Sequence, residues 1–143
     1  AKVVKIVDGD TITALDAQNT TIKIRMYGID APESKQAFGQ KAKQALTTAI
    51  ATKIITVIDH GTDIYGRMLG TIWLDGYDIN ASMVDSGYAW VYRFEDNAIV
   101  PGYIKYESAA QKEAKGLWAD TNPVPPWQWR QANEKPRKVK EKK

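Results

Sequence analysis

The stretch TTIKIRMYGIDAPE, residues 20–33, decides the fold, because a strict alternation of side chains runs straight into a charged turn. Apolar residues occupy every second position of its first half, which is the pattern of a strand with one buried face. Arg25 should therefore point away from the face that carries Ile24. Asp30 and Glu33 follow on either side of a proline, so one guanidinium and two carboxylates lie close together in the chain. Such a group can bind a divalent cation and a phosphodiester.

Four more stretches have the composition of strands, and three have the spacing of helices. The predicted strands are VVKIV (3–7), DTITALD (10–16), KIITVID (53–59) and MLGTIWLD (68–75). The predicted helices lie at 36–52, with Ser34 as the candidate N-cap, at 79–87, and from Pro101 to Gly116. The proline-rich segment 122–129 is expected to be neither helix nor central strand, and to lie across the surface with Trp127 or Trp129 as an anchor.

This order of elements, with one helix after the third strand and the others near the end, predicts an α+β fold. The specific prediction is a five-stranded OB-type (oligonucleotide-binding) β-barrel with three α-helices. At 143 residues the chain has the length of one domain. We place that domain at residues 1–129 and a basic, disordered tail at residues 130–143.

The composition limits the kinds of site that the chain can form. It has no cysteine, which excludes disulfides and thiolate metal sites, and its single histidine, His60, disfavours an imidazole-rich zinc site or a Ser/His/Asp triad. A bound metal must therefore take oxygen ligands, as calcium, magnesium and manganese do. His60 lies in DHGTD (59–63), which is predicted to be a polar turn, and is expected to be solvated. No apolar run reaches the roughly 18 residues of a membrane span, so no membrane insertion is expected.

The net charge of +3 is unevenly distributed along the chain. Residues 130–143 hold seven basic and two acidic side chains, a net charge of +5, so the other 129 residues carry a net charge of −2. The body is therefore not a surface of the kind that coats nucleic acid, and a bound polyanion would need locally placed cations. The tail is either a solvated end or a weak electrostatic tether for nucleic acid or another anionic surface.

Three short segments supply charged groups that strands and helices do not require. They are VDGDT (7–11), RMYGIDAPE (25–33) and DIYGR (63–67). Each has an ordinary structural explanation on its own: DGD is common turn chemistry, DAPE suits a helix N-terminus, and YGR suits a hairpin turn. The combination is more specific, because two of the three arginines before residue 130 sit beside glycine-containing turns next to carboxylates.

The motifs DGDT, IRMYGIDAPE and DIYGR, in this order, resemble the staphylococcal nuclease (thermonuclease) family. The resemblance extends from about Val3 to Trp118 and includes GLW at the end of the last predicted helix. It implies a barrel with three helices and a calcium-dependent phosphodiesterase that cleaves DNA and RNA with little sequence preference. It also implies that the substrate is single-stranded or unpaired nucleic acid and that the products carry 3′-phosphate ends.

The resemblance further implies a role for each matching residue. The Ca²⁺ ligands would be Asp10, Asp30 and the backbone carbonyl of Ala31; the catalytic residues would be Arg25, Glu33 and Arg67; the substrate contacts would be Tyr65 near a terminal phosphate and Tyr92 against a base. Glu33 would either deprotonate the attacking water or orient it. This chain has Ile64 where relatives often have Lys, which would weaken the grip on an extra phosphate. It has Ala31 where Thr is common, which should be tolerated because a carbonyl is the ligand.

Two other functions remain open from the sequence. A non-catalytic OB-fold module could bind nucleic acid or protein through the same scaffold, but it would not need these acids and arginines together. A structural or interaction protein is suggested only by the tryptophans near the C-terminal end. Because members of the resembled family are often exported, we expect a secreted or periplasmic location. We also expect a monomer.

Overall fold

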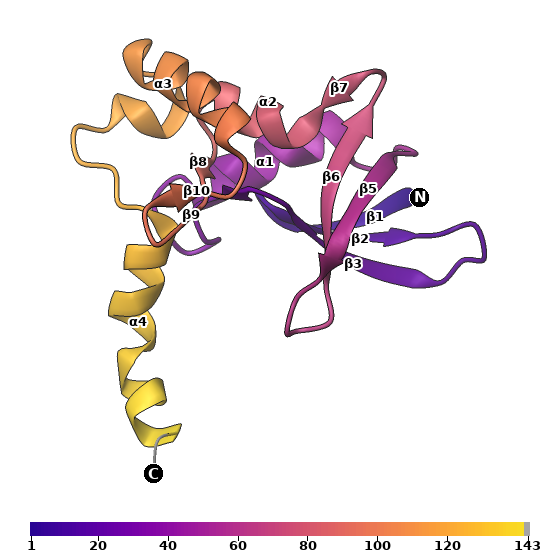
Figure 1. Ribbon diagram of the computed structural model, residues 1–143, viewed down its shortest axis with the longest axis horizontal. Helices are drawn as coiled ribbons and strands as arrows, with labels where there is room; N and C mark the ends of the chain where they lie inside the picture. Colours follow the sequence, from indigo (N-terminus) through magenta and orange to yellow (C-terminus); the bar gives the residue numbers. More distant parts are fainter. Residues whose placement is uncertain (142–143) are drawn as a thin grey trace.

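The computed structural model describes residues 1–141, and beyond residue 133 it describes the backbone alone. It shows an α+β fold in which a mixed sheet lies beside a group of helices (Figure 1). The strands are β1 (Lys2–Asp8), β2 (Thr11–Leu15), β3 (Thr21–Met26), β4 (Ile29–Asp30), β5 (Thr56–Thr62), β6 (Met68–Leu74), β7 (Tyr77–Asp78), β8 (Trp90–Val91), β9 (Arg93–Phe94) and β10 (Asn97–Ala98). The helices are α1 (Gly39–Ile50), α2 (Ile79–Asp85), α3 (Ile104–Lys112) and α4 (Pro126–Glu141), with short 3₁₀ helices at Pro101–Tyr103 and Gly116–Ala119.

The main sheet has the strand order β1-β2-β3-β6-β5, and β7 pairs with β6. Its strands pair antiparallel except for β3 and β6, which run parallel. The register between β2 and β3 places Thr11 opposite Arg25, so the β1–β2 turn lies next to the charged end of β3. A separate antiparallel pair joins β4 to β8 and places Asp30 opposite Trp90. The predicted α+β class and the five main strands are therefore confirmed.

The hydrophobic core explains why the alternating stretch decides the fold. Ile24 and Met26 of β3 are fully buried, while Lys23 between Ile22 and Ile24 is exposed. Helix α1 packs Leu46 into the same core. Because alternate side chains of a strand point to opposite faces, burying the isoleucine face leaves Arg25 on the other face, as the sequence predicts.

Two finer predictions about the architecture differ from the structure. The described strands do not form a closed barrel, because only one isolated bridge, between Lys2 and Ile54, joins β1 to the residues just before β5. The described residues contain four α-helices rather than three. The extra helix, α4, begins inside the segment that was expected to be non-helical. Pro126 is tolerated there because the first amides of a helix have no helical partner to lose.

The predicted start of the first helix also needs correction. Helix α1 begins at Gly39, and its N-cap is Phe38 rather than Ser34. The residues before α1 form backbone turns that are closed by hydrogen bonds to the carbonyls of Glu33 and Gln36.

The predicted domain boundary at residue 129 falls inside α4, and residues 142–143 lie outside the described part of the chain. The division into a domain and a disordered tail remains a prediction. No helix in the described part is both long and apolar enough to span a membrane.

One buried polar side chain joins α2 to the sheet. Asn80 is fully buried, and its Oδ1 accepts a hydrogen bond from the Ile72 amide at 3.1 Å. Its Nδ2 donates to the carbonyls of Tyr27 at 2.9 Å and Gly70 at 3.0 Å. These partners lie just after β3 and within β6, so Asn80 reinforces the parallel pair that carries Arg25.

We expect Asn80→Ala to lower the free energy of unfolding by about 3 kcal/mol, because it leaves buried backbone groups without partners. Urea unfolding followed by tryptophan fluorescence measures this loss. The control is Asn97→Ala, since Asn97 is exposed and should change stability by no more than about 0.5 kcal/mol. A loss below about 1 kcal/mol for Asn80→Ala would contradict this account.

Candidate active site

Asp10 is held at the turn between β1 and β2 with its carboxylate directed into the protein. Its Oδ2 accepts the amide of Ala31 at 2.7 Å, and its Oδ1 accepts the hydroxyl of Thr11 at 3.0 Å. Gly9 has to be small, because a Cβ there would lie 2.8 Å from the β-carbons of both Ala31 and Ala42. The turn therefore approaches the segment after β4 more closely than any side chain at residue 9 would allow.

Arg25 contacts the carboxylates of Asp10 and Asp30. Its Nη2 lies 3.5 Å from Oδ2 of Asp10 and 3.3 Å from Oδ1 of Asp30. Its Nη1 donates to the Met26 carbonyl at 2.8 Å, which fixes the guanidinium beside its own strand. The fold thus brings acids from two separate segments of the chain to the guanidinium of Arg25.

A second guanidinium, that of Arg130 in α4, contacts Asp30 as well and also reaches Glu33. Arg130 donates through Nη1 to Oε2 of Glu33 at 2.7 Å and to Oδ1 of Asp30 at 3.1 Å. Its Nη2 donates to Oδ2 of Asp30 at 2.7 Å. The side chain of Glu33 is 32% exposed whereas that of Asp30 is 0% exposed, so of these two acids only Glu33 can meet solvent water.

The hairpin between β5 and β6 presents Arg67. Asp63 accepts the amides of Tyr65 and Arg67, each at 2.9 Å, and the Nε of Arg67 at 2.8 Å. Among the described residues Arg67 has no other ion pair, so its two terminal nitrogens remain available. The Tyr65 ring lies against this guanidinium, with the Arg67 Cζ 5.4 Å from the ring centre. Ile64 is 90% exposed at the hairpin tip.

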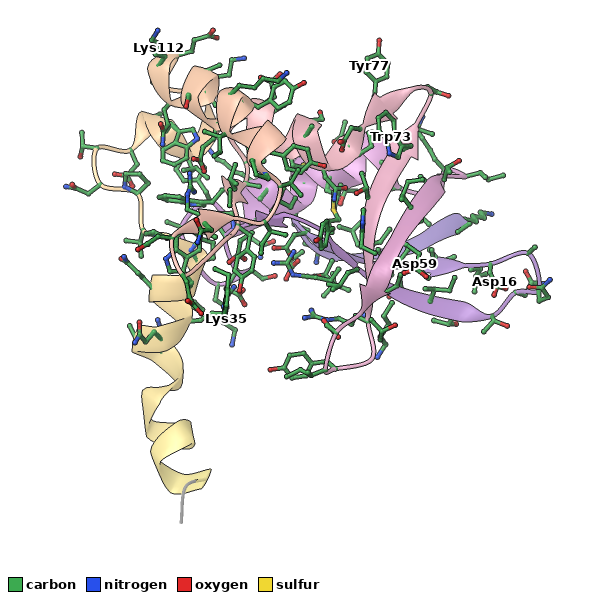
Figure 2. The ribbon with its side chains drawn as sticks, viewed as in Figure 1. Asp16, Lys35, Asp59, Trp73, Tyr77 and Lys112 are labelled. Carbon is green, nitrogen blue, oxygen red and sulfur yellow. The ribbon has the colours of Figure 1, made fainter. Side chains whose placement is uncertain are left out.

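Most of these groups line a single cleft of about 880 Å³, but the fully buried Asp30 is not part of its lining. Its walls include Asp10, Arg25, Glu33, Tyr65, Arg67 and Tyr92 of the predicted site, together with Trp127 and Arg130 of α4. The volume is typical of a site for a small ligand. Other acids lie elsewhere: Asp16 just after β2 and Asp59 in β5 are on the part of the molecule away from α4 (Figure 2). Asp30 and Ala31 are buried, and Ala31 contacts Asp10 through its amide, so its role as a carbonyl ligand remains a prediction.

The close acids shift one another's ionisation. Burial, followed by the charge of Asp10, raises the pKa of Asp8 to about 8. Burial also acts to raise the pKa of Asp10, but the charge of Arg25 and the hydrogen bonds to Asp10 outweigh it and lower that pKa. Burial lowers the pKa of Arg130, yet its bonds and charge contacts with Asp30 and Glu33 raise it overall. At neutral pH, Asp10 is therefore ionised while Asp8 largely keeps its proton.

The carboxylates at this site could supply some, but not all, of the ligands that a hard cation needs. Asp10 and Asp30 present carboxylate oxygens within 3.5 Å of one nitrogen of Arg25, so the two acids face a common point. In the part of the chain that the structure describes, no group of three or more His, Cys, Asp or Glu side chains is arranged to hold a metal. A calcium ion bound here would therefore need carbonyl oxygens and water to complete its six to eight ligands.

Several charged residues named from the sequence, among them Asp10, Arg25, Glu33 and Arg67, line one cleft in the structure, but the contribution of α4 was not predicted. Arg130 was assigned to a tail from the sequence, whereas the structure places this arginine in the cleft. Trp127 packs on Trp90 with ring centres 5.5 Å apart, and Trp90 lies opposite Asp30, so the tryptophan directs α4 toward the acids. The one available signal was an arginine directly after tryptophans in a tail otherwise rich in lysine.

His60 has more contacts than the sequence suggests. It is exposed, as expected, but it lies in β5 rather than in the predicted turn, and its ring stacks on Tyr27 with centres 4.2 Å apart. Its Nε2 lies 2.8 Å from the hydroxyl of Thr71. These contacts hold His60 beside Tyr27, which itself lines the cleft, so the histidine supports the wall of the cleft.

Comparison with known proteins places this chain in a family. The family described as "Staphylococcal nuclease homologue" matches residues 23–120. The chain is 41% identical to "Protein ParB" of Escherichia coli, over 90% of this chain and 77% of that protein. It is 43% identical to an "Uncharacterized endonuclease" of Haemophilus influenzae, over 90% of this chain and 71% of that protein. It is 39% identical to a "Micrococcal nuclease" of Shigella flexneri, over 92% and 80% of the two chains. The chain therefore belongs to the staphylococcal nuclease family.

We expect the contact between Asp63 and Arg67 to persist into acid solution. Burial acts to raise the pKa of Asp63, but its hydrogen bonds with Arg67 and Tyr65 lower it below the usual 3.8. A lowered carboxylate pKa means that the contact is fully present above about pH 4 and is lost as the pH falls through the lower folded value. The NMR signal of the Arg67 Nε–H should stay constant from pH 7 to pH 4 and shift only below that. The same signal in Asp63→Asn is the control, and a wild-type shift centred above pH 4 would contradict the prediction.

Proposed function

We propose that this chain is a calcium-dependent nuclease that hydrolyses phosphodiester bonds in single-stranded or unpaired DNA and RNA, with little sequence preference, and leaves 3′-phosphate ends. The family match and relatives named endonuclease and micrococcal nuclease support the nuclease function. The observation that carries the proposal is one cleft lined by Arg25, Arg67 and Glu33 in front of the paired acids Asp10 and Asp30.

The two arginines suit a phosphate whose negative charge grows in the transition state. Arg25 is fixed by its contacts with Asp10, Asp30 and the Met26 carbonyl, so it is already in place when substrate arrives. Arg67 is fixed through its Nε by Asp63, which leaves its terminal nitrogens to fork onto phosphate oxygens. Electrostatic stabilisation of this kind is the main contribution that a protein can make to phosphoryl transfer.

Calcium held by Asp10, Asp30 and the Ala31 carbonyl would supply further positive charge beside a non-bridging phosphate oxygen. Glu33 would act on the attacking water, as base or as orienting group. In the hydrolysis the water oxygen bonds to phosphorus, the bond to the 5′ oxygen breaks, and that oxygen leaves with a proton. Solvent access to Glu33 supports its assignment to the water rather than to the metal.

The position of Glu33 depends on Gly39. A Cβ at Gly39 would lie 1.8 Å from the Glu33 carbonyl oxygen, so the first residue of α1 packs directly on the backbone of Glu33. The Glu33 amide donates to Oε1 of Gln36 at 3.1 Å, and Gln36 donates in turn to the Val124 carbonyl at 2.6 Å. The segment before α1 is thereby fixed between the helix and the chain that leads into α4.

Several finer features remain predictions. They are the monomeric state, the secreted or periplasmic location, and the stacking role of Tyr92. Tyr92 lines the cleft and its amide donates to the Gly28 carbonyl at 3.0 Å, which supports a position near the bases of a bound strand.

The proposed function is tested by incubating the purified chain with denatured DNA, with and without calcium. We expect shortened fragments with 3′-phosphate ends in calcium and intact DNA in excess EDTA. Arg67→Ala should lower the rate on the order of 10³-fold or more, because a transition-state arginine is lost. Its stability should change by no more than about 1 kcal/mol, since its ion pair lies at the surface.

The matched control for Arg67→Ala is Lys115→Ala. Lys115 is 41% exposed in its ion pair with Glu113 and does not line the cleft, so its removal should leave the rate unchanged. Full cleavage in EDTA would remove calcium from the mechanism. A strand that is shifted on a gel but stays intact in calcium would favour the non-catalytic binding module instead.

Gly39→Ala should lower the nuclease rate about 10²-fold, because the new methyl group displaces the backbone of Glu33 by an ångström or more. Rates on denatured DNA in saturating calcium provide the measurement. Gly102→Ala is the matched control, since a Cβ at Gly102 meets nothing within 4 Å. Equal rates for the two variants would show that the backbone of Glu33 tolerates displacement and does not position the water.

A further inference from the structure

Arg130 occupies both oxygens of an acid that the proposed function assigns to calcium. Its two terminal nitrogens form a fork onto Oδ1 and Oδ2 of Asp30, at 3.1 Å and 2.7 Å, and Nη1 also reaches Glu33 at 2.7 Å. Forked pairs of this kind are the strongest arrangement that arginine and carboxylate can form. Asp30 is fully buried, so this pair is shielded from solvent on the carboxylate side.

A cation on Asp30 and the fork from Arg130 exclude each other. Calcium binds carboxylate oxygens at about 2.3–2.6 Å, so it would lie within a few ångströms of a guanidinium that contacts the same two oxygens. The repulsion between these charges is weakly screened in a buried site. Arg25 does not have this conflict to the same degree, because its contact with Asp30 is a single one at 3.3 Å and its other terminal nitrogen is bound to the Met26 carbonyl.

Arg130 also has freedom to leave, which Arg25 lacks. Arg25 belongs to a central strand of the sheet, whereas Arg130 belongs to α4, which extends away from the body of the molecule (Figure 1). The side chain of Arg130 is 30% exposed and lines the cleft, so it can turn into solvent without any change in the core. Trp127, one helical turn earlier, keeps α4 beside Asp30 while the arginine side chain moves.

We infer that Arg130 is a built-in competitor of the divalent cation: it pairs with Asp30 and Glu33 when the cation is absent and must release them when the cation binds. This inference rests on the proposed function, because it needs Asp30 to be a cation ligand. Arg130 is then a positioning residue that sets the affinity of the site for calcium. If the fork is closed about nine-tenths of the time, the apparent dissociation constant for calcium is about tenfold weaker than that of the open site.

The test is isothermal titration of calcium chloride into metal-free wild type, Arg130→Ala and Arg130→Lys, without nucleic acid. We expect Arg130→Ala to bind calcium about tenfold more tightly than wild type, because the open site no longer has a competitor. Arg130→Lys should fall between them, since lysine keeps the charge but cannot form the fork. The matched control is Gln128→Ala, an exposed position on α4 that does not line the cleft and should leave the affinity unchanged.

The outcomes separate this inference from the proposed function. Equal calcium affinity in wild type and Arg130→Ala, or weaker affinity in the variant, would overturn the competitor role while leaving a calcium-dependent nuclease in place. No calcium binding by any of the proteins would overturn both.

A second measurement covers the case in which the variant is less well folded. The melting temperature of each protein is recorded in EDTA and at one calcium concentration well above both dissociation constants, because a ligand that binds only the folded state stabilises it more when it binds more tightly. We expect Arg130→Ala to melt below wild type in EDTA and to gain more from calcium than wild type does. An equal gain in the two proteins would overturn the inference.

Discussion

The hydrogen bond from the Ala31 amide to the Asp10 carboxylate is the contact on which the rest of the site depends. It is buried, 2.7 Å long, and joins the β1–β2 turn to the segment that follows β4. A charged acceptor makes it stronger than a neutral amide bond. Because Gly9 brings these two segments into contact, Asp10 and Asp30 come within reach of the same guanidinium of Arg25. The sheet supplies the frame, but this bond decides that the acids converge.

The charge balance of the site explains why the chain needs α4. Asp10, Asp30 and Glu33 gather in or beside a buried region, and burying a carboxylate without a partner is costly. Arg25 alone cannot pair with all three, and the chain before residue 130 carries a net charge of −2. Arg130 supplies the missing positive charge at Asp30 and Glu33. Arg130, the first residue of the basic segment 130–143, therefore forms its ion pairs inside the fold.

Features of this fold that depend on local patterns can be predicted from the sequence, whereas pairings between distant residues cannot. Alternation in β3 located Arg25 on the correct face, because a shift of one residue would expose Ile24 and bury the arginine. The pairing of Arg130 with Asp30 spans 100 residues and has no periodic signal. Pro126 hid the start of α4, since a proline suggests a break unless its place in the first turn is known. The closure of the predicted barrel also depends on a pairing, between β1 and β5, that alternation within each strand does not determine.

The crowding of acids at the β1–β2 turn lowers stability in a way that depends on pH. Burial and the nearby charge of Asp10 raise the pKa of Asp8 from 3.8 to about 8, so the folded chain holds this proton more tightly than the unfolded chain does. Between about pH 4 and pH 8, ionisation of Asp8 therefore removes folding stability as the pH rises, and above that range the loss is complete. Because the turn is least stable when its carboxylates are fully ionised, a positive charge placed beside it stabilises it. Arg25 supplies such a charge in this structure, through its contact with the Asp10 carboxylate at 3.5 Å.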